Sequence, residues 1–580
     1  MTNNALAERR HSLAHLLAAA VLELYPTALP TIGPATDTGF YYDFEFKEPI
    51  TDKDLEKIEK KMKTLLPSFS SFAGKEVPKE QALAAFEHNV YKKELIKEIV
   101  DRGEALTLYT SGHFTDLCRG GHIDNLSKID PDSFKLTHLA GAYWRGDEKN
   151  KMLTRIYGLA FNTKKELVAH EDMLEESKKR DHRKLGAELG LFAFSPLVGP
   201  GLPLFTPKGT ILRRLIEEFV WSLTEPHGYE RVWIPHLAKV DLYKTSGHYD
   251  KFADDIFWVK SQKIDDDFIL KPMNCPHHTQ IYASSPRSYR DLPIRYSEVT
   301  SVYRDENTGQ LAGLTRVRSI TQDDGHIFAT PEHVKDEVKK IYDVITKFYK
   351  AFNMPLSIRL SLHDPAKKTD YLGSSELWQK SENNLREILE ELGEEYEEGV
   401  GEAAFYGPKM DFIATDAIGR KWQLATAQLD FNQPERFGLE YTASDGTKQR
   451  PVMIHRAILG SVERFLGITI EHYAGAFPLW LSPVQVALLP IGKDHEEYAQ
   501  KIMRELKKHS IRVELKAEDE TLGKRIRNAK VEKVPYVLVV GDKEMEAETV
   551  SVESRNDGQL GALTINNFIK KVTEEIKNKE

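Results

Sequence analysis

The first 169 residues combine helical and strand-like spacings of apolar side chains. Leucine and valine recur at three- and four-residue intervals over 12–24, which predicts an amphipathic helix. Apolar and polar residues alternate over 39–46, which predicts a strand, while 53–65 is typical of a charged helix and 152–158 of a closing strand. This mixture predicts an α+β domain over 1–169.

Three further regions follow in the sequence. Residues 170–185 are almost wholly charged, which predicts a solvated helix that links two domains. From 186 to 480, strands rich in valine, isoleucine and aromatic residues alternate with a few helices, and this is the largest region. Residues 481–580 contain three short apolar strands separated by two helices, which predicts a small α/β domain with a parallel-rich sheet.

Composition places the chain among large globular proteins. Its 580 residues are 41% apolar, which is enough for roughly three or four domains. The 80 basic and 89 acidic residues give a net charge of −9, which excludes a wholly basic nucleic-acid binder. The mean hydropathy is −0.46, and the sequence has no uncharged apolar run long enough to cross a bilayer. We therefore expect no membrane-spanning segment.

The N-terminus and the cysteines bear on cellular location. A pair of arginines precedes an apolar run and imitates a signal peptide, but His15 and Glu23 interrupt that run and no small-residue cleavage site follows. We therefore expect a folded helix rather than a secretion signal. The only two cysteines, Cys118 and Cys275, are too few for a disulfide framework. A reducing, cytoplasmic location is expected.

Histidines accompany the first cysteine. His11 and His15 are four residues apart and so share one face of the predicted helix, while Cys118 and His122 form a second pair across a glycine-containing turn. Either pair alone is more often an ordinary structural feature. The two pairs together favour a site at which four nitrogen or sulfur side chains converge.

The surroundings of the second cysteine leave its partners open. Prolines on both sides of Cys275 predict that its thiol projects from irregular backbone. Its companions are either the adjacent His277 and His278 or distant histidines. His326 is expected at the end of a strand beside a cleft, and His455 at the entry to an apolar helix. A lone histidine in such a place is more often structural than functional.

Several arginines lie in segments that otherwise predict strand or buried helix, where a guanidinium needs a partner. They are Arg304, Arg316, Arg318, Arg456 and Arg464. An anionic substrate such as a polyphosphate would satisfy this need, and pairing with Glu298, Asp323 or Glu463 would satisfy it equally. The sequence has neither a P-loop nor a G-x-G-x-x-G motif, so a nucleotide would be bound by arginines.

These segments resemble those of a known enzyme class. The signature motifs 1, 2 and 3 of class II aminoacyl-tRNA synthetases are similar to residues 229–235, 295–306 and 460–465. Within that class, the threonyl-tRNA synthetase family is similar at 271–276, 316–326, 405–409 and 452–457. The two Cys/His pairs of the first domain resemble the editing domain of that family. The resemblance covers nearly the whole chain.

The resemblance implies a domain order and an activity. The order is an α+β editing domain at 1–169, a linker helix at 170–185, a class II antiparallel-sheet catalytic domain at 186–480 and an α/β anticodon-binding domain at 481–580. The activity is ATP-dependent ligation of L-threonine to tRNA(Thr) through threonyl-adenylate, with hydrolytic editing of mischarged seryl-tRNA. ATP with Mg²⁺, one catalytic Zn²⁺ per subunit and a homodimer formed through the catalytic domain are implied as well.

The resemblance also assigns residues to these roles. It places Zn²⁺ on Cys275, His326 and His455, and the anticodon on Glu546 and Arg555. The residues implied for adenylate chemistry are Arg304, Glu306, Arg316 and Arg464. Those implied for substrate binding are Met273, Gln322, Asp324, Tyr406, Gln423, Thr426, Gln428 and Ser461. Those implied for editing, in a metal-free and water-mediated reaction, are His11, His15, Cys118 and His122, with Asp116 and Lys92 in lesser roles.

Two Cys/His sites suit the selectivity that this reaction demands. Threonine and valine are nearly isosteric, so an apolar pocket separates them poorly, whereas a Zn²⁺ ion with an open position can require both an amino group and a hydroxyl. Serine keeps the hydroxyl and lacks only a methyl, a difference of about 1–3 kcal/mol. Misacylation with serine is therefore expected, and a second, hydrolytic site removes it.

The chain departs from the family in two places. The ubiquitin-like domain that commonly precedes the editing domain is expected to be absent, because the editing helix begins close to Met1. The editing turn has Gly121 where the family has proline, which predicts a more flexible turn. A non-catalytic RNA-binding paralogue is an alternative, but it would be expected to have lost Arg304, Arg464 or the zinc residues. A class II synthetase for proline or serine is another, and it would leave the two Cys/His sites unexplained.

Overall fold

The computed structural model describes residues 3–516 and 520–579, and the chain forms two compact units, Met1–Glu175 and Glu176–Glu580. Each unit contains its own hydrophobic cores and its own sheets. The combination of α+β and α/β parts confirms the fold class that the sequence predicts.

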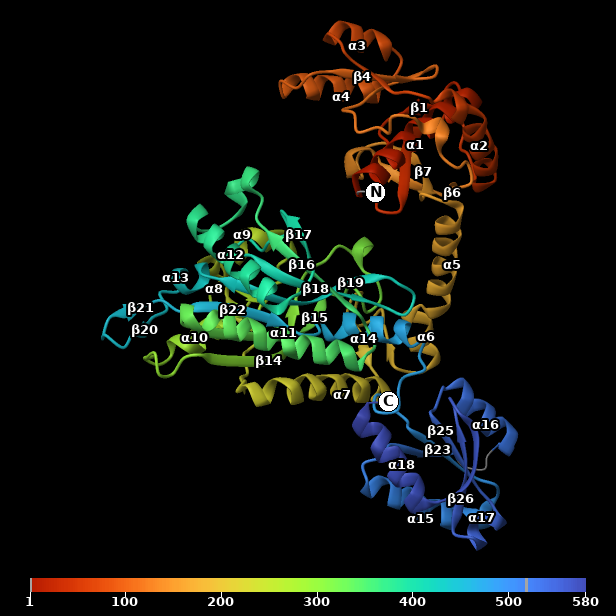
Figure 1. Ribbon diagram of the computed structural model, residues 1–580, viewed down its shortest axis with the longest axis vertical. Coiled ribbons are helices and arrows are strands. Elements are labelled where there is room, and N and C mark those ends of the chain that lie inside the picture. The colour runs from red at the N-terminus through yellow and green to blue at the C-terminus, as the bar shows by residue number, and fades with distance from the viewer. Residues whose placement is uncertain (1–2, 517–519, 580) are drawn as a thin grey trace. The chain divides into compact units, whose positions relative to one another are not determined.

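The first unit is built around an antiparallel sheet. Its strand order is β1 (Leu29–Pro30), β2 (Gly39–Glu45), β7 (Met152–Ala160) and β6 (Phe134–Tyr143). Two helices, α1 (Asn3–Leu24) and α2 (Asp52–Leu65), pack with this sheet in one core (Figure 1). From Ser12 to Val21 every residue of α1 is buried, so the helix is central to the unit and not amphipathic as expected. Four alanines in this stretch let neighbouring elements approach the helix on all sides.

A smaller sheet completes the first unit. Its strands are β3 (Ala73–Glu76), β4 (Thr107–Ser111) and β5 (Phe114–Leu117), and its helices are α3 (Lys79–Ala85) and α4 (Val90–Asp101). The side chain of Asn89 caps α4 by accepting hydrogen bonds from the amides of Tyr91 and Lys92. This cap fixes the start of the helix, and Lys92 lies in its first turn.

The charged segment forms two helices rather than the single helix expected. They are α5 (Lys164–Arg180) and α6 (His182–Glu188). Asp181 separates them because its side chain accepts a hydrogen bond from the amide of Arg183 and so caps α6. His182 is only 4% exposed, in contrast to the solvated face that the charged composition predicts.

The second unit contains an eight-stranded, largely antiparallel sheet. The strand order is β10 (Glu230–Arg231), β14 (Ile294–Tyr303), β15 (Ser319–Ala329), β22 (Val452–Ala457), β19 (Lys421–Asp430), β18 (Lys409–Thr415), β16 (Leu356–Leu362) and β17 (Tyr396–Val400). Only the two edge pairs are parallel. Strands β14 and β15 pair over ten residues and form the longest pairing in this sheet.

Helices cover this sheet and pack against it in the largest core. They are α7 (Pro207–Thr224), α11 (Val334–Ala351), α12 (Ser375–Leu392) and α14 (Val462–His472). The other elements around the sheet are α8 (Val240–Ser246), α9 (His248–Phe252), α10 (Cys275–Ala283), α13 (Asn432–Arg436), β8 (Phe192–Ala193), β9 (Leu204–Phe205), β11 (Leu237–Lys239), β12 (Trp258–Val259), β13 (Phe268–Leu270), β20 (Tyr441–Thr442) and β21 (Lys448–Gln449).

The C-terminal part of the second unit has a five-stranded mixed sheet. Its order is β24 (Val513–Leu515), β23 (Val486–Pro490), β25 (Tyr536–Val540), β26 (Thr549–Ser554) and β27 (Gly558–Thr564). The first three strands are parallel, as expected. The accompanying helices are α15 (Glu496–Lys508), α16 (Leu522–Val531), α17 (Asp542–Glu546) and α18 (Ile565–Asn578) (Figure 1). Within 3–516 and 520–579, none of the helices has the length and apolar character needed to cross a membrane.

Candidate functional site

A pocket of about 350 Å³ opens in the second unit between the loop that joins β14 to β15, strand β19 and the start of α14. Its lining residues are Arg304, Glu306, Thr315, Arg316, Val317, Ile320, Gln322, Gln423, Leu424, Gly460, Ser461 and Arg464. The predicted residues Arg304, Glu306, Arg316, Gln322, Gln423, Ser461 and Arg464 are therefore brought together here. They come from segments about 160 residues apart in the sequence.

Two of the pocket's arginines are half-buried and have no carboxylate partner among the described residues. Neither Arg304 nor Arg464 forms an ion pair with a carboxylate of the described residues, and the Nε atom of each is buried without a hydrogen-bond partner. Arg304 lies over the ring of Phe252 at 4.8 Å and Arg464 over Trp422 at 5.8 Å. Burial lowers the pKa of both guanidinium groups. Guanidinium groups without an ion pair to the described residues favour an anion brought from outside.

The other arginines of this region are paired within the protein. Arg456 forms an ion pair with Asp323 at 2.5 Å and donates to Ser297 at 2.6 Å. Arg316 pairs with Glu306 at 2.6 Å, and Arg318 donates to the carbonyl oxygen of Glu306. Intramolecular pairing thus explains Arg456 and Arg318, while an external anion is needed for Arg304 and Arg464.

Cys275, His326 and His455 form a buried group beside this pocket. One ligand atom from each lies within 4.8 Å of those of the others. The register of β15 with β22 places His326 opposite His455. Cys275 begins helix α10, where Pro276 is tolerated in the first turn. The expected irregular backbone at Cys275, strand end at His326 and helix entry at His455 are therefore wrong. Cys275 lies in a helix, and strand pairing places the two histidines inside the sheet.

A second layer of side chains orients these three residues. His326 Nδ1 lies 2.7 Å from His278 Nδ1, and His278 Nε2 lies 3.5 Å from Glu298. His455 Nε2 lies 2.9 Å from Asp430 Oδ2. The partners of Cys275 are thus the distant His326 and His455, and His278 contacts His326 from outside the group. Outer carboxylates and imidazoles of this kind fix the ring orientation of metal-binding histidines.

The chemistry of the three donors fits a zinc ion. One cysteine and two histidines, all at most 5% exposed, match the three-ligand set that leaves a fourth position open. His248, which the sequence did not single out, lies with Nε2 3.6 Å from the Cys275 sulfur. Burial lowers the pKa of His248 to about 3. Its position in a run of polar residues after Gly247 gave no local signal for this contact.

The remaining predicted substrate residues lie around the Cys/His group. Tyr406 stacks on His455 with ring centroids 4.9 Å apart and donates to Gln428 at 2.5 Å. Gln428 in turn donates to Thr426 at 3.3 Å. Asp324 accepts a hydrogen bond from Asn274 at 3.1 Å. Met273 contributes its sulfur 3.1 Å from Arg304, so it connects this group to the arginine pocket.

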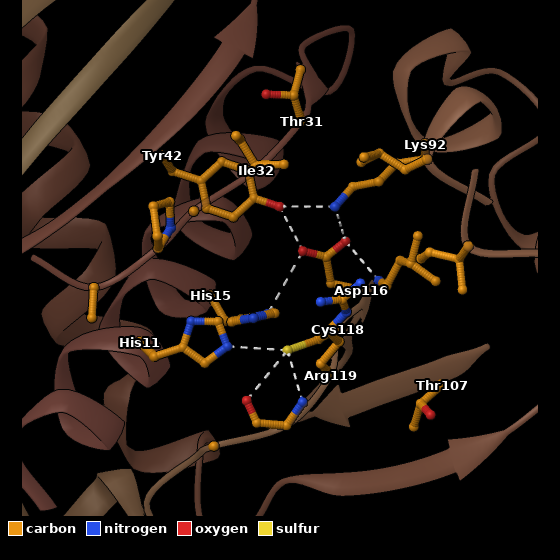
Figure 2. Close-up of a pocket in the computed structure, with 18 of the residues that line it drawn as sticks. His11, His15, Thr31, Ile32, Tyr42, Lys92, Thr107, Asp116, Cys118 and Arg119 are labelled. Atoms are coloured by element: carbon orange, nitrogen blue, oxygen red, sulfur yellow. Dashed lines mark hydrogen bonds and ion pairs between the residues drawn. The ribbon is translucent and has the colours of Figure 1, made fainter. Parts of the chain in front are cut away.

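The first unit contains a separate pocket of about 740 Å³ (Figure 2). His11 and His15 enter it from α1, Lys92 from α4 and Asp116 from β5, and Cys118 lies just beyond β5. All five are predicted site residues. Figure 2 shows them facing the same cavity together with Tyr42 and Thr31. His122 is not among the lining residues and joins the group through its contact with the Cys118 sulfur.

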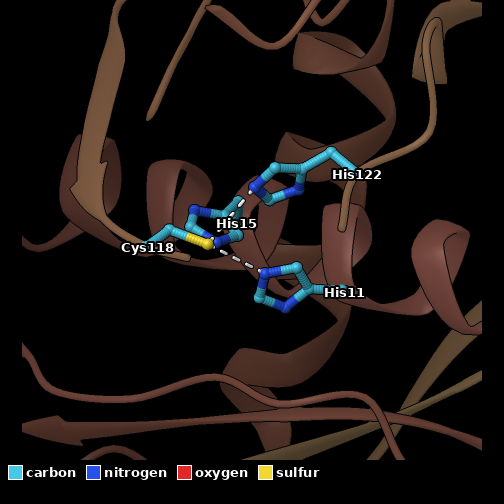
Figure 3. A group of neighbouring side chains, drawn as sticks. All are labelled: His11, His15, Cys118 and His122. Atoms are coloured by element: carbon cyan, nitrogen blue, oxygen red, sulfur yellow. Dashed lines mark hydrogen bonds between the residues drawn. The ribbon is translucent and has the colours of Figure 1, made fainter. Parts of the chain in front are cut away.

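Three histidines surround the sulfur of Cys118 (Figure 3). His11 Nε2 lies 3.0 Å from this sulfur and His122 Nε2 lies 3.4 Å from it. His15 stands edge-on to both of the other rings. Burial lowers the pKa of His122 to about 3 and lowers that of His11, while it raises the pKa of the Cys118 thiol to about 11. Neutral imidazoles and a neutral thiol therefore prevail at pH 7.

Asp116 connects the other pocket residues in a buried network. It forms an ion pair with Lys92 at 2.5 Å, accepts a hydrogen bond from the Tyr42 hydroxyl at 2.5 Å and lies 3.7 Å from His15 Nδ1. Lys92 also donates to the Tyr42 hydroxyl at 3.2 Å. Tyr42 was not predicted as a site residue. The alternation of 39–46 indicated a strand but did not show that this hydroxyl would find a buried carboxylate 74 residues away.

The turn between Cys118 and His122 requires its glycines. Gly120 has φ +96° and Gly121 has φ +80°. Proline holds φ near −65°, so the proline expected at position 121 from the family is incompatible with this backbone. A side chain at Gly120 would also collide with the Tyr109 hydroxyl at 2.6 Å. The turn is thus built for glycine.

The two predicted anticodon residues differ in their surroundings. Glu546 is exposed at the end of α17. Arg555 donates to the carbonyl oxygens of Lys533 and Phe477, each at 2.7 Å. These are contacts of a structural arginine, and a role in tRNA binding stays a prediction for both residues.

The chain matches three protein families along its length. Residues 106–157 match the threonyl and alanyl tRNA synthetase second additional domain. Residues 257–473 match the tRNA synthetase class II core domain (G, H, P, S and T), and residues 485–575 match the anticodon binding domain. The arginine pocket and the Cys275 group lie within the second of these matches, and Cys118 and His122 lie within the first.

Relatives are similar over nearly the full length. The threonine–tRNA ligase of Synechococcus elongatus is 47% identical over 98% of this chain and 95% of its own length. That of Gloeobacter violaceus is 49% identical over 95% of this chain and 89% of its own length. The solved structure of the RNA binding domain of threonyl-tRNA synthetase from Cryptosporidium parvum Iowa II is 37% identical, with a TM-score of 0.65, over 68% of this chain and 98% of that one.

Proposed function

The chain belongs to the threonine–tRNA ligase family, and from this membership we infer that it joins L-threonine to tRNA(Thr) with ATP, through threonyl-adenylate. The observation that carries the inference is the pocket lined by Arg304 and Arg464, whose Nε atoms are buried without a hydrogen-bond partner. The match to a class II catalytic core speaks against a non-catalytic RNA-binding paralogue.

Adenylate formation joins two anions, so charge stabilisation governs it. A carboxylate oxygen of threonine attacks the α-phosphorus of ATP, and the bond from that phosphorus to the β-phosphate oxygen breaks, releasing pyrophosphate. We assign Arg304 to the α-phosphate and the carboxylate, Arg464 to the γ-phosphate, and Glu306 with Arg316 to the adenine side. Mg²⁺ enters with ATP and offsets phosphate charge. Guanidinium groups held in place before the reaction lower its barrier without reorganisation.

The assignment of Arg304 is tested by ATP–pyrophosphate exchange. Arg304→Ala should abolish the exchange while threonine still binds, because threonine selection resides in the neighbouring Cys/His group. Arg450→Ala is a matched control, since Arg450 is a half-exposed arginine of the same unit that pairs only with Glu435 among the described residues. Retained exchange in Arg304→Ala would refute the assignment.

We propose that Cys275, His326 and His455 hold one Zn²⁺ ion per subunit. Such an ion, when bound, offers an open position that recognises the amino and hydroxyl groups of threonine together. Valine, which lacks the hydroxyl, is then rejected. Metal analysis of wild-type protein should give one zinc per chain. Cys275→Ser should lose it and Cys118→Ser should keep it, whereas active protein without zinc would refute the proposal.

We assign Asp324 to the hydroxyl group of threonine. Its carboxylate lies next to the Cys/His group, 3.7 Å from His326 Nε2. Tyr406, Gln428, Thr426, Gln322, Gln423, Met273 and Ser461 complete the substrate contacts. Asp324→Asn should reduce the preference for threonine over valine in the exchange reaction. An unchanged preference would show that the carboxylate does not read the hydroxyl.

We propose that the pocket of the first unit hydrolyses seryl-tRNA. A water oxygen attacks the ester carbonyl carbon, an imidazole of His11 or His15 takes the water proton, and the ribose hydroxyl leaves with a proton returned to it. The neutral state of these imidazoles suits a general base. Cys118, His122, Asp116 and Lys92 shape the pocket. Deacylation of pre-formed seryl-tRNA measures this activity directly.

Three further proposals concern the anticodon contacts, the oligomeric state and the cellular location of the protein. Glu546 and Arg555 are assigned to anticodon contact by resemblance alone. A homodimer through the catalytic part is supported by Trp233, which is 77% exposed in the segment that resembles motif 1. Light scattering of the purified protein tests the dimer. A cytoplasmic location agrees with two free cysteines in the whole sequence.

A further inference from the structure

A third group of side chains that could bind a metal lies outside both sites, but its histidine makes hydrogen bonds within the protein instead. Asp181, His182 and Glu471 approach one another in the second unit. Both ring nitrogens of His182 are already occupied by protein atoms, however. Nε2 accepts a hydrogen bond from the amide of Leu314 at 2.9 Å, which leaves the proton on Nδ1, and Nδ1 donates to Glu471 at 2.6 Å. The imidazole therefore has no lone pair left for a metal.

The first of these bonds holds the loop that joins β14 to β15. Leu314 is fully buried, and the next two residues, Thr315 and Arg316, line the arginine pocket. Gly313 has φ +55°, and a side chain there would lie 2.2 Å from His182 Nε2. The loop can approach the imidazole this closely only because position 313 is glycine. The hydrogen bond to Leu314 thus fixes the base of the turn that carries Arg316.

The second bond holds the helix that carries Arg464. Glu471 lies in the last turn of α14, two turns after Arg464, and its oxygen Oε1 also accepts a hydrogen bond from the amide of His182 at 3.1 Å. Its other oxygen pairs with Arg420 at 2.7 Å. Arg180 adds a further tie by donating to the carbonyl oxygen of His472 at 3.0 Å.

The imidazole packs tightly between these two elements. A side chain added at Gly467 of α14 would lie 3.5 Å from His182 Cδ2 and 3.3 Å from the side chains of Leu314 and Thr315. The close approach makes α6, the loop and α14 one packed block, with the imidazole at its centre.

We propose that His182 is a positioning residue for ATP: it fixes the loop of Arg316 to the helix of Arg464, so that the arginines on the two sides of the pocket keep the spacing that ATP requires. The inference rests on the proposed function. A change of about 1 Å in such spacing is enough to cost a large factor in rate.

Substitutions at His182 separate its two bonds. His182→Ala removes both. His182→Gln keeps an acceptor near the position of Nε2 for the Leu314 amide, and His182→Asn keeps a donor near the position of Nδ1 for Glu471. Arg183→Ala is the matched control, because Arg183 is exposed on the same turn and its ion pair is with Asp181.

The measurement is ATP–pyrophosphate exchange, normalised by active-site titration so that unfolded protein does not count. His182→Ala should raise the KM for ATP at least fivefold and leave the KM for threonine and the zinc content within twofold of wild type. His182→Gln should recover most of the ATP affinity, and Arg183→Ala should resemble wild type.

Two results would overturn the inference. One is an unchanged KM for ATP in His182→Ala, or in His182→Asn if the alanine variant does not fold. The other is an equal change in the KM values for ATP and threonine, which would indicate a general structural role. Failure of the proposed function would look different, because the wild-type protein would then show no threonine-dependent exchange at all.

Discussion

At the scale of single residues, the pockets of the two units differ in how their charged side chains are paired. Lys92 and Asp116 are 2% exposed and neutralise each other, with Tyr42 donating to the same carboxylate. Arg304 and Arg464 are half-buried and form no ion pair with a carboxylate of the described residues. A paired network shapes a pocket, whereas unpaired guanidinium groups bind an anion brought from outside.

The paired network makes a prediction about stability. Asp116→Asn removes the charge that balances Lys92 and should lower the free energy of unfolding of the first unit by about 3 kcal/mol. Hydrogen exchange in peptides from α4 and β5 would report the loss. The double variant Lys92→Met/Asp116→Leu should be closer to wild type, because it buries no unpaired charge. Equal protection in wild type and Asp116→Asn would show that the ion pair contributes little.

The histidines of the same pocket make a prediction about pH. Burial lowers the pKa of His11 and lowers that of His15 well below its usual value. A lowered histidine pKa means that the neutral form persists as the pH falls, so a base of this kind stays active below its ordinary titration range near 6.5. The rate of seryl-tRNA deacylation, measured from pH 5 to 8, should therefore begin to fall only below pH 6. A midpoint near 6.5 would contradict this.

At the scale of elements, local pattern predicted what is periodic and missed what depends on pairing. The helix at 53–65 and the strand at 152–158 follow from spacing alone and lie within a few residues of their observed bounds. His455 was placed at a helix entry but lies on β22, where its neighbour is His326, 129 residues earlier. A window of local sequence contains no information on that register.

The candidate sites contain residues that could be predicted from the sequence and residues that could not. The ligand types of both Cys/His groups and the pocket arginines were identified, largely through resemblance to a family. Tyr42, His248 and His182 were missed as site residues, because each acts through a partner far along the chain. Buried hydrogen-bond networks are properties of tertiary packing, and composition near such residues resembles that of any loop or strand.

The backbone conformation at Gly121 allows us to predict the effect of two substitutions on deacylation. Gly121→Pro should disrupt the turn, since φ +80° is unavailable to proline, and should slow seryl-tRNA deacylation at least tenfold by displacing His122. Gly121→Ala should have a smaller effect, because a Cβ there meets nothing within 4 Å and only the positive φ costs energy, about 1 kcal/mol. If Gly121→Pro were as active as wild type, the glycine turn would not be needed for editing.

At the scale of the whole molecule, Arg555 tests how the C-terminal part is used. Its guanidinium donates to Lys533 and Phe477, which joins the five-stranded sheet to the segment that precedes it. Arg555→Ala should lower the melting temperature by several degrees, because it removes two hydrogen bonds from a charged donor. Glu546→Ala should leave the melting temperature unchanged and raise the KM for tRNA. A raised KM for tRNA in Arg555→Ala without any thermal change would place both residues at the anticodon.

The proposed synthetic and editing sites lie in different compact units, 176–580 and 1–175 respectively, and the last prediction rests on this separation. The double variant His11→Ala/His15→Ala should lose seryl-tRNA deacylation by about a hundredfold, the usual contribution of a positioned base, and keep threonine-dependent ATP–pyrophosphate exchange. Arg304→Ala should show the reverse, because its charge serves the α-phosphate and the carboxylate in the second unit. Both activities are measured on the same preparations, so a folding defect would appear as a loss of both. Undiminished deacylation in the histidine variant would exclude the first pocket as the editing site. Loss of exchange in that variant would show instead that the adenylation pocket depends on the first unit for its shape.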